Sequence, residues 1–478
     1  MDLVTFICFS VLLYIIICLL GCRVTLFGGL QKNINCIKNH GIDKLSLSEI
    51  IAGYCPTLSN TRSIYSPHFF LLNGHFQTIY SGLFTKIFKN QIEYIRELVD
   101  TPDGGVISLD WTEKPGLSDK TTFYIFIMHG LTGGSHESYV QDLIIESKKY
   151  GYKCVVMNFR GCSETPVKTP QLYCGSFTSD VDVAVKHIIK TDHNAKIFGV
   201  GFSLGANILT KYVGQQGQNS LLVGLVSIGN PYDLLGTYRA VERTIIGRNL
   251  YIPRMGYNLL KVIRRHTSAF INTSWFDLKE LEKTKTVLEY DEVTTRRCFG
   301  YKTVHEYYRF GSCVIDIPYI DIPTLFLTAL DDPIAVAEVI PYFEIKANPN
   351  TILATTEKGG HLGWFVATPG YILPHKRWFP KPVMEFVDAI IKTRPPIQVS
   401  LNKESITGTP WYSMPNESIA ARKNEVNSRN TSAAIETDNS GAIVAKSDRT
   451  RGWLRFLSAN LRFEHLVAFY YLIKYLKR

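Results

Sequence analysis

The stretch FGVGFSLGAN, residues 198–207, places Ser203 between two glycines at the end of an apolar run. The run predicts a strand, and the residues after Ser203 predict a helix over 204–216. Gly201 and Gly205 carry no side chain that would collide inside a tight strand-to-helix turn, so the serine hydroxyl can project from that turn. A serine hydroxyl is a weak nucleophile on its own, so it requires a base and a group that orients the base.

The segments around this turn repeat a strand and helix alternation. Apolar runs such as TFYIFIMHG and YKCVVMNFRG are separated by amphipathic patterns that predict helices over 136–149, 179–190 and 204–216. Such an alternation predicts an α/β fold, with a mostly parallel central sheet and helices on both faces. Upstream, residues 94–111 alternate apolar and polar side chains around Asp103-Gly104-Gly105, which predicts an antiparallel hairpin.

Two candidate partners for Ser203 follow later strands. Asp332 comes after TLFLTALD, and His361 comes after TILATTEKGG. Because ligands and reactive groups gather at the carboxyl ends of parallel strands, we expect the three side chains to meet there. Ser203 would attack an acyl carbon, His361 would take its proton, and Asp332 would orient the imidazole. Asp331 stays open as an alternative to Asp332, since only one of these neighbours can face the histidine.

Acyl transfer also needs hydrogen-bond donors for the oxyanion. The backbone N–H of Leu204 follows the nucleophile directly, and that of Leu131 lies in the string HGLTGG, residues 129–134. These are the two expected positions of oxyanion donors, and the chain order Ser, Asp, His is typical of α/β hydrolases. Side chains and backbone donors suffice for this chemistry, so we expect no metal and no other cofactor.

The alternation is interrupted once and then ends. Residues 233–310 hold aromatic and basic helical pieces, which predict a helical lid inserted into a hydrolase domain over 60–395. Residues 396–451 are rich in Ser, Asn, Thr and charge, so a disordered linker is expected. Residues 452–478 predict a basic aromatic helix, which lies either on an anionic membrane face or against the domain.

The N-terminal residues 3–22 carry no charge. Twenty residues at 1.5 Å per residue span the ~30 Å of bilayer hydrocarbon, so we expect a single transmembrane anchor and keep a cleaved signal peptide as the alternative. Lysines and arginines follow the span, beginning with Arg23, which favours a cytosolic catalytic portion. The endoplasmic reticulum or another endomembrane is the expected location.

Composition narrows the class of protein. The chain has 478 residues, of which 45% are hydrophobic and 20% charged, as in a folded protein with a large core. Its formal net charge of +10 suits anionic surroundings, but no nucleic-acid-binding pattern is present, so a nucleic acid partner is not expected. The cysteines form no CxxC pair, which argues against a zinc site or a disulfide framework. Nothing in the composition indicates an oligomeric state.

Several longer strings resemble one family. They are NGHFQT (73–78), LDW (109–111), HGLTG (129–133), NFRGC (158–162), GFSLGAN (201–207), the stretch 291–308, ALDDP (329–333) and GGHLG (359–363). Over residues 60–395 the chain resembles the membrane-anchored ABHD branch of the α/β-hydrolase superfamily, which includes YheT-like hydrolases and the medium-chain fatty acid ethyl ester synthases/esterases. An H-x4-D string, His187 to Asp192, is interpreted as a solvent-exposed coincidence at a helix end.

The resemblance implies a single-pass membrane serine hydrolase with Ser203, Asp332 and His361 as its triad. Acylglycerols, short- or medium-chain esters and phospholipids are the implied substrates, cleaved through an acyl-enzyme. Two alternatives remain. The same triad could pass the acyl group from acyl-CoA or an ester to an alcohol, or the fold could serve as a non-catalytic lipid-binding receptor.

Overall fold

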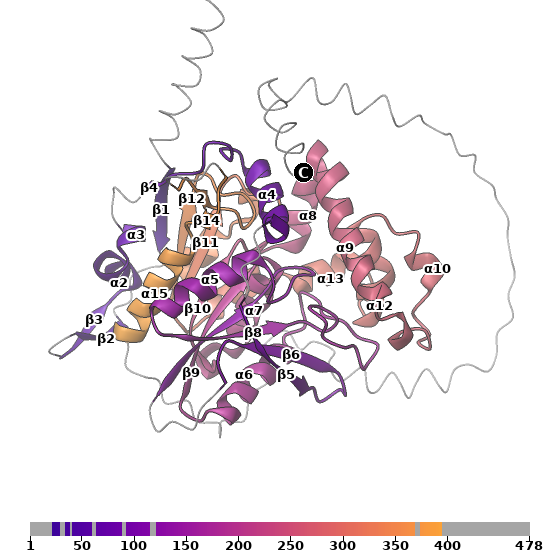
Figure 1. The fold of residues 1–478 in the computed structure, drawn as a ribbon, viewed down its shortest axis with the longest axis horizontal. Helices are drawn as coiled ribbons and strands as arrows, with labels where there is room; N and C mark the ends of the chain where they lie inside the picture. Colours follow the sequence, from indigo (N-terminus) through magenta and orange to yellow (C-terminus); the bar gives the residue numbers. More distant parts are fainter. Residues whose placement is uncertain are drawn as a thin grey trace, which may run out of the picture. The chain divides into compact units, whose positions relative to one another are not determined.

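One sheet of ten strands forms the framework of the described part of the chain (Figure 1). The computed structural model describes residues 22–28, 34–38, 41–59, 64–87, 92–114, 121–368 and 373–393. The strand order is β4-β1-β12-β11-β10-β9-β7-β8-β6-β5. The strands are β1 (Cys22–Gly28), β4 (Ile64–Tyr65), β5 (Ile95–Asp100), β6 (Val106–Trp111), β7 (Thr122–Met128), β8 (Lys153–Asn158), β9 (Ala195–Phe202), β10 (Leu222–Ile228), β11 (Thr324–Ala329) and β12 (Thr351–Thr356).

The centre of the sheet is parallel and both of its edges are antiparallel. Strands β8, β7, β9, β10, β11 and β12 run parallel to their neighbours within this set. The hairpin β5–β6 closes one edge, with Asp100 opposite Val106, and β1 and β4 close the other. The mostly parallel sheet and the hairpin around Asp103 are both as predicted. Two short pairs lie outside the sheet, β2 (Ile34–Lys38) with β3 (Gly41–Leu45) and β13 (Phe365–Val366) with β14 (Lys376–Arg377).

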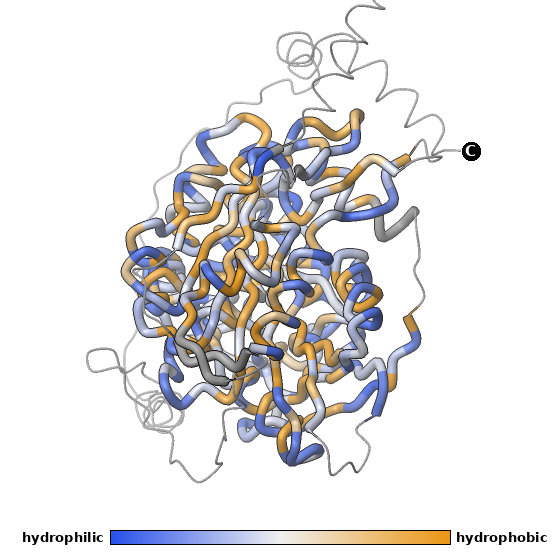
Figure 2. Tube along the Cα trace, turned by 90° about the vertical axis from the view of Figure 1, so that its left-hand side faces the viewer, coloured by the Kyte–Doolittle hydropathy of each residue, from blue (hydrophilic) through white to orange (hydrophobic). Residues whose placement is uncertain are grey.

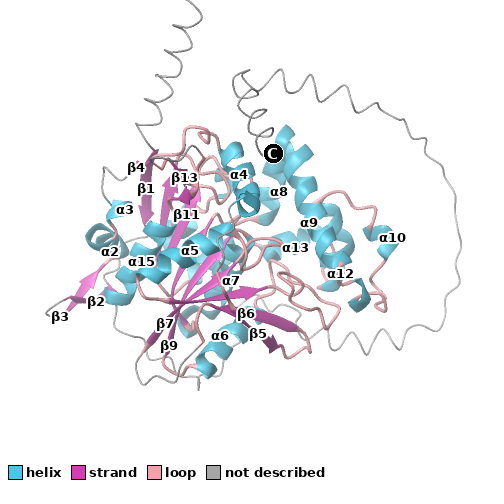
Figure 3. Ribbon diagram, in the orientation of Figure 1, coloured by secondary structure: helices cyan, strands magenta, loops and turns pink. Residues whose placement is uncertain are grey.

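Helices cover both faces of the sheet, as Figure 3 shows. Side chains on β7 alternate between two buried clusters, with Phe126 on the face of α6 and α7 and Ile127 on the face of α2, α5 and α15. Hydrophobic residues follow the central strands in Figure 2. The flanking helices are α2 (Leu47–Tyr54), α3 (Pro56–Ser59), α4 (Gly74–Ile87), α5 (Ser138–Lys149), α6 (Ser179–Thr191), α7 (Leu204–Gln216), α14 (Tyr342–Ala347) and α15 (Pro380–Thr393). Helices α5, α6 and α7 match the three predicted from the sequence.

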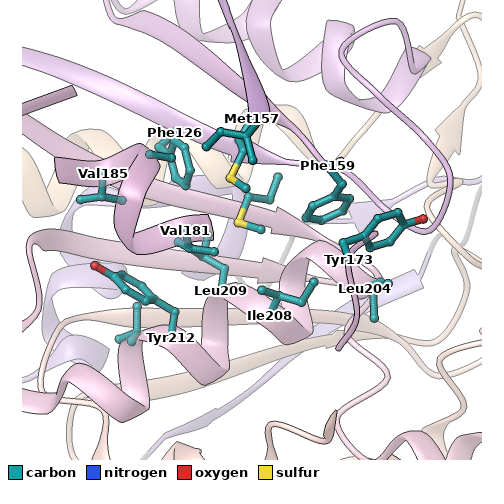
Figure 4. Close-up of a cluster of buried hydrophobic side chains, with 14 of the residues drawn as sticks. Phe126, Met157, Phe159, Tyr173, Val181, Val185, Leu204, Ile208, Leu209 and Tyr212 are labelled. Carbon is teal, nitrogen blue, oxygen red and sulfur yellow. The ribbon is translucent and has the colours of Figure 1, made fainter. Parts of the chain in front are cut away.

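The cluster drawn in Figure 4 fastens α6 and α7 to the sheet. Ile208 and Leu209 of α7 and Val181 of α6 pack with Phe126 and Met157 of the strands. Full burial of each such side chain contributes roughly 1.5–3 kcal/mol. The start of α7, and with it Ser203, is therefore held by a rigid core.

A helical insertion, defined here as residues 234–311, lies between β10 and β11. In Figure 1 its larger helices lie together beside the sheet. It contains α8 (Leu234–Arg243), a π-helix η2 (Gly247–Tyr251), α9 (Ile252–Arg264), η3 (Thr267–Ala269), α10 (Leu278–Leu281), α11 (Val287–Tyr290), a π-helix η4 (Asp291–Thr295), α12 (Arg296–Cys298) and α13 (Val304–Gly311). The remaining short 3-10 helices are η1 (Gly217–Asn219), η5 (Val314–Tyr319) and η6 (Ala337–Val339).

The domain begins earlier than the predicted boundary at residue 60. Strand β1 pairs with β12 from Val24 opposite Thr356 to Gly28 opposite Ile352, and α2 packs on α15. The predicted boundary was wrong because β1 is short and directly follows an apolar run. In the sequence its residues therefore look like the end of that run. Residue 22, the last of the predicted anchor, belongs to β1, and residues 3–21 lie outside the described residues.

No helix within the described ranges combines the length and the hydropathy needed to cross a bilayer. The predicted linker over 396–451 and the predicted helix over 452–478 also lie outside the described residues. Both stay predictions.

Candidate active site

Ser203 lies at the turn between β9 and α7 with a backbone φ of 53° and ψ of −119°. A positive φ is costly for a residue with a Cβ, and such strain is typical of functional turns. A Cβ on Gly201 would lie 2.6 Å from the Cα of Ala206, and one on Gly205 would lie 2.4 Å from the carbonyl oxygen of His129. Only glycine fits at either position, which is the reason expected from the sequence.

The side chains of Ser203, His361 and Asp332 form a continuous hydrogen-bonded chain. The Nε2 atom of His361 lies 2.9 Å from the Oγ of Ser203, and its Nδ1 lies 2.8 Å from the Oδ2 of Asp332. The other carboxylate oxygen of Asp332 accepts the N–H groups of Ile334 and Ala335 at 2.8 and 2.9 Å. A carboxylate so held can keep the proton of the imidazole on Nδ1, which leaves Nε2 free to accept the serine proton.

Asp331 contacts the residue before His361. Its Oδ1 accepts the N–H of Gly360 at 2.8 Å, and burial raises the pKa of its carboxyl to about 6. Asp331 therefore shapes the loop before the histidine, whereas Asp332 contacts the imidazole. These contacts favour Asp332 over Asp331, and the catalytic role of Asp332 stays a prediction.

The two expected oxyanion donors border the same cavity as Ser203. Leu131 and Leu204 both line it, and a Cβ added to Gly130 would lie 3.2 Å from the Cβ of Ser203. Within the described part of the chain, neither the N–H of Leu131 nor that of Leu204 donates to a protein acceptor. Both N–H groups are therefore available to an oxygen bound beside the serine.

His129 holds the oxyanion loop, a role that the sequence analysis did not assign. Its Nδ1 lies 2.7 Å from the carbonyl oxygen of Gly130, and its Nε2 accepts the N–H of Phe159 at 3.3 Å. These contacts place the proton on Nδ1. Burial lowers the pKa of His129 to about 4, so the ring is neutral at physiological pH.

A buried carboxylate holds the far end of the same loop. Asp110 on β6 accepts the Oγ–H of Ser135 at 2.6 Å and the amide of Asn158 at 2.8 Å, and it pairs with Arg96 at 2.7 Å. The Oδ1 of Asn158 in turn accepts the N–H of Ser135 at 2.9 Å. The LDW and NFRGC strings, which served as family markers, thus supply the support for the HGLTGG loop.

The NGHFQT string supports the loop that carries His361. Thr78 accepts the N–H of His361 on its Oγ1 at 2.8 Å and donates to the carbonyl oxygen of Gly74 at 2.7 Å. Gln77 accepts the N–H of Phe365 at 3.0 Å. A Cβ on Gly74 would lie 1.9 Å from the carbonyl oxygen of Asp331, so α4 touches both loops of the site. The NGHFQT string could be recognised in the sequence as a family marker. Its structural role could not, because that role depends on contacts with residues almost 290 positions later in the chain.

An apolar cavity of about 130 Å³ extends from Ser203 into the helical insertion. Leu234, Ile252, Leu259 and Phe270 are among its lining residues. One carboxyl group, that of Asp291, also borders it. The Asp291 oxygens accept the hydroxyls of Thr295 at 2.6 Å and Tyr308 at 2.9 Å, and burial raises the pKa of Asp291 to about 7.

The H-x4-D string is remote from this arrangement. His187 lies 2.9 Å from Glu97 on the outer hairpin, and Asp192 accepts the hydroxyl of Tyr124 at 2.9 Å. Asp192 is buried, so the expectation of a solvent-exposed string is wrong for that residue. It caps the end of α6 and ties it to β7.

Comparison with known proteins agrees with the fold. Residues 124–241 match the family described as alpha/beta hydrolase fold. A monoacylglycerol lipase of Saccharomyces cerevisiae is 33% identical over 72% of this chain and 84% of its own length. The human phospholipase ABHD3 is 30% identical over 67% of this chain and 77% of its own length. A medium-chain fatty acid ethyl ester synthase/esterase 2 of S. cerevisiae is 26% identical over 72% of this chain and 89% of its own length. The chain belongs to the ABHD branch of the α/β-hydrolase superfamily.

Proposed function

We propose that the protein is a serine carboxylic ester hydrolase acting on lipids. One observation carries the proposal: the hydrogen-bonded chain from Asp332 through His361 to Ser203 ends at an apolar cavity. A non-catalytic lipid receptor would need the cavity alone, without an oriented base on the serine.

The reaction follows from the positions of these groups. Ser203 Oγ attacks the ester carbonyl carbon while His361 Nε2 takes the hydroxyl proton, and the N–H groups of Leu131 and Leu204 stabilise the oxyanion. The tetrahedral intermediate collapses, the C–O bond breaks, and His361 returns the proton to the leaving alcohol. Water then attacks the acyl-enzyme by the same route, which releases the acid and restores Ser203.

A lipid acyl chain is the group that suits the cavity. Each CH₂ moved from water into an apolar site contributes ~0.8 kcal/mol, so the lining favours a chain over a polar acyl group. The names of the relatives, a monoacylglycerol lipase and a phospholipase, support lipid esters as the substrate class.

The test is labelling with a fluorophosphonate probe together with assay of a lipid ester panel. We expect labelling of the parent and none of Ser203→Ala, with hydrolysis of monoacylglycerols or phospholipids by the parent alone. Equal labelling of both chains would place the reactive serine elsewhere.

A second function, transfer of the acyl group to an alcohol, is favoured by the relative named as an ethyl ester synthase/esterase. Both reactions share the acyl-enzyme and differ only in whether water or an alcohol attacks it. Product analysis with added ethanol or glycerol separates them, since hydrolysis alone at high alcohol concentration rejects the transferase.

We further propose that residues 3–21 anchor the chain in an endomembrane such as the endoplasmic reticulum, with the catalytic portion in the cytosol. The uncharged run and the arginine that follows it support this arrangement. Protease protection of intact microsomes is the test, since a luminal catalytic portion would resist digestion.

A further inference from the structure

Two buried tyrosine hydroxyls contact the backbone of the HGLTGG loop. The hydroxyl oxygen of Tyr139 accepts the N–H of Gly130 at 3.1 Å. The hydroxyl oxygen of Tyr173 accepts the N–H of Thr132 at 2.9 Å. Each tyrosine is only 8% exposed. The N–H of Leu131 lies between these two groups along the chain, and within the described ranges it has no protein acceptor.

The two tyrosines reach the loop from opposite faces of the sheet. Tyr139 belongs to the buried cluster on the face of α2, α5 and α15. Its ring centroid lies 4.9 Å from that of Phe202, the residue before Ser203. Tyr173 belongs to the cluster on the face of α6 and α7, and its ring stacks on that of Phe159 with centroids 4.5 Å apart. Both hydroxyls are therefore held in place by rings that are packed in the core.

The peptide group between Gly130 and Leu131 is also held at its carbonyl end. The carbonyl oxygen of Gly130 accepts the N–H of Gly133 at 3.1 Å and lies 2.7 Å from the Nδ1 of His129. A trans peptide group is planar, so contacts that fix the carbonyl of Gly130 also fix the direction of the N–H of Leu131. The peptide groups on either side carry the N–H groups that the tyrosines hold. The middle peptide group therefore cannot rotate alone.

Thr132 has a backbone conformation that needs support. Its φ is 59°, in the left-handed region, where a β-branched residue is strained. Such a conformation persists only where the surrounding contacts favour it. Its N–H donates to the hydroxyl of Tyr173, so loss of that hydroxyl would leave a strained residue with an unpaired N–H.

We propose that the hydroxyls of Tyr139 and Tyr173 direct the N–H of Leu131 at the substrate oxygen by holding the two neighbouring N–H groups. Both tyrosines are thus positioning residues of the oxyanion site. The proposal rests on the proposed ester hydrolysis, in which the N–H of Leu131 stabilises the oxyanion. Burial raises the pKa of each tyrosine well above its ordinary value, so both hydroxyls stay protonated and neutral. Tyr173 also lines the cavity, so one side chain both borders the acyl site and supports the loop.

The test compares Tyr139→Phe and Tyr173→Phe with the parent chain and with Tyr124→Phe. Each substitution removes one buried hydroxyl and keeps the ring. Tyr124 is the matched control, because its hydroxyl donates to Asp192 at 2.9 Å near the start of β7, whereas the loop follows the end of that strand. Labelling with the fluorophosphonate probe counts the active sites in each preparation. The kcat for a soluble ester then refers to folded molecules only.

We expect each of the two loop variants to lower kcat roughly tenfold to hundredfold with little change in KM, because loss of a whole oxyanion donor costs about 10²–10³-fold. Tyr124→Phe should keep the kcat of the parent.

A trifluoromethyl ketone inhibitor gives an independent measure. The Oγ of Ser203 adds to the ketone carbon, the serine proton passes to His361, and the carbonyl electron pair becomes the negative charge on the hemiketal oxygen. This adduct resembles the transition state, so the inhibition constant should rise by the same factor by which kcat/KM falls. In Tyr124→Phe the inhibition constant should stay at the value of the parent.

The outcomes separate a positioning role from a structural one. A loop variant with lower thermal stability, but with the parent's kcat for each labelled site and the parent's inhibition constant, would overturn the proposal. If one loop variant does not fold, the other decides, since each hydroxyl holds a different N–H. A parent chain that hydrolyses no ester and takes no probe would instead overturn the proposed function, and the role of the tyrosines with it.

Discussion

At the scale of single residues, the site depends on which of two adjacent carboxyl groups faces the histidine. Asp332 contacts His361 and receives two backbone N–H groups, whereas Asp331 contacts Gly360. Because the two residues are adjacent, Asp332→Asn and Asp331→Asn form a matched pair of substitutions. Each leaves the volume of the side chain unchanged.

Asp332→Asn is expected to lower kcat by roughly 10⁴-fold, because an amide cannot hold the proton on Nδ1 of His361. Asp331→Asn keeps an oxygen acceptor for the N–H of Gly360 and should lower kcat by less than about tenfold. Steady-state hydrolysis of a soluble ester, after a check of folding by circular dichroism, measures both. Equal losses in the two variants would reject the assignment of Asp332.

Thr78 is a positioning residue, since it acts through the backbone of His361. Thr78→Val leaves the N–H of His361 without its acceptor and should cost about 1–3 kcal/mol of local stability, with kcat falling more than KM rises. Thr78→Ser keeps the hydroxyl and should restore most of the activity. If valine and serine at this position give the same kcat, the hydrogen bond does not position the histidine.

Part of this site could be predicted from the residues. Ser203, Asp332 and His361 each follow a recognisable apolar strand, so the rule for parallel sheets places them at one edge. The roles of His129 and Thr78 could not be predicted, because each works by one hydrogen bond to a backbone group of another loop. No periodicity or local spacing encodes such a contact.

At the scale of elements, α4 connects the two loops of the triad. Its first residue touches the carbonyl of Asp331 and its second turn binds the histidine loop. The same helix carries a second glycine, Gly82, with nothing within 4 Å of the position that a Cβ would take. Substitutions at these two glycines therefore distinguish the effect of close packing of α4 from the effect of helix propensity.

Gly74→Ala is expected to destabilise the protein by about 1–3 kcal/mol or more, because its Cβ has no room against backbone. Gly82→Ala should instead stabilise it by roughly 0.5–1 kcal/mol, since alanine is the better helix former. Chemical denaturation measures both free energies of unfolding. A stabilising effect at Gly74 would contradict the close approach of α4 to the Asp331 loop.

The elements themselves were predictable to different degrees. Helices α5, α6 and α7 follow from clear apolar periodicity between strands, and the hairpin follows from its Asp-Gly-Gly turn. Strand β1 was missed, because a strand of seven residues carries little pattern and its partner β12 lies more than 300 residues away.

At the scale of the whole molecule, burial of His129 links stability to pH. Its pKa is about 4 in the folded protein, whereas an unperturbed histidine titrates at 6.5. Between these values the unfolded chain binds a proton that the folded chain does not, so the free energy of unfolding falls as the pH decreases through this window. Across this window the titration of His129 lowers the free energy of unfolding by up to about 3 kcal/mol.

His129→Gln is expected to flatten this dependence, because glutamine offers a donor and an acceptor without titrating. Urea unfolding at about pH 7 and about pH 5 measures the difference. His305→Gln, at an exposed position, serves as the control and should leave the slope unchanged. An unaltered slope in His129→Gln would mean that another group causes the acid sensitivity.

Strand β1 has a practical consequence for shortened versions of the chain. A version that starts at residue 60 would lack β1, so β12 would lose its antiparallel neighbour. The backbone amide and carbonyl groups on that side of β12 would then be unpaired, beside the loop that carries His361. Exposed strand edges pair with strands of other molecules, so this shortened version should self-associate and elute early in gel filtration. A version that starts at residue 22 keeps this edge covered and should stay monodisperse.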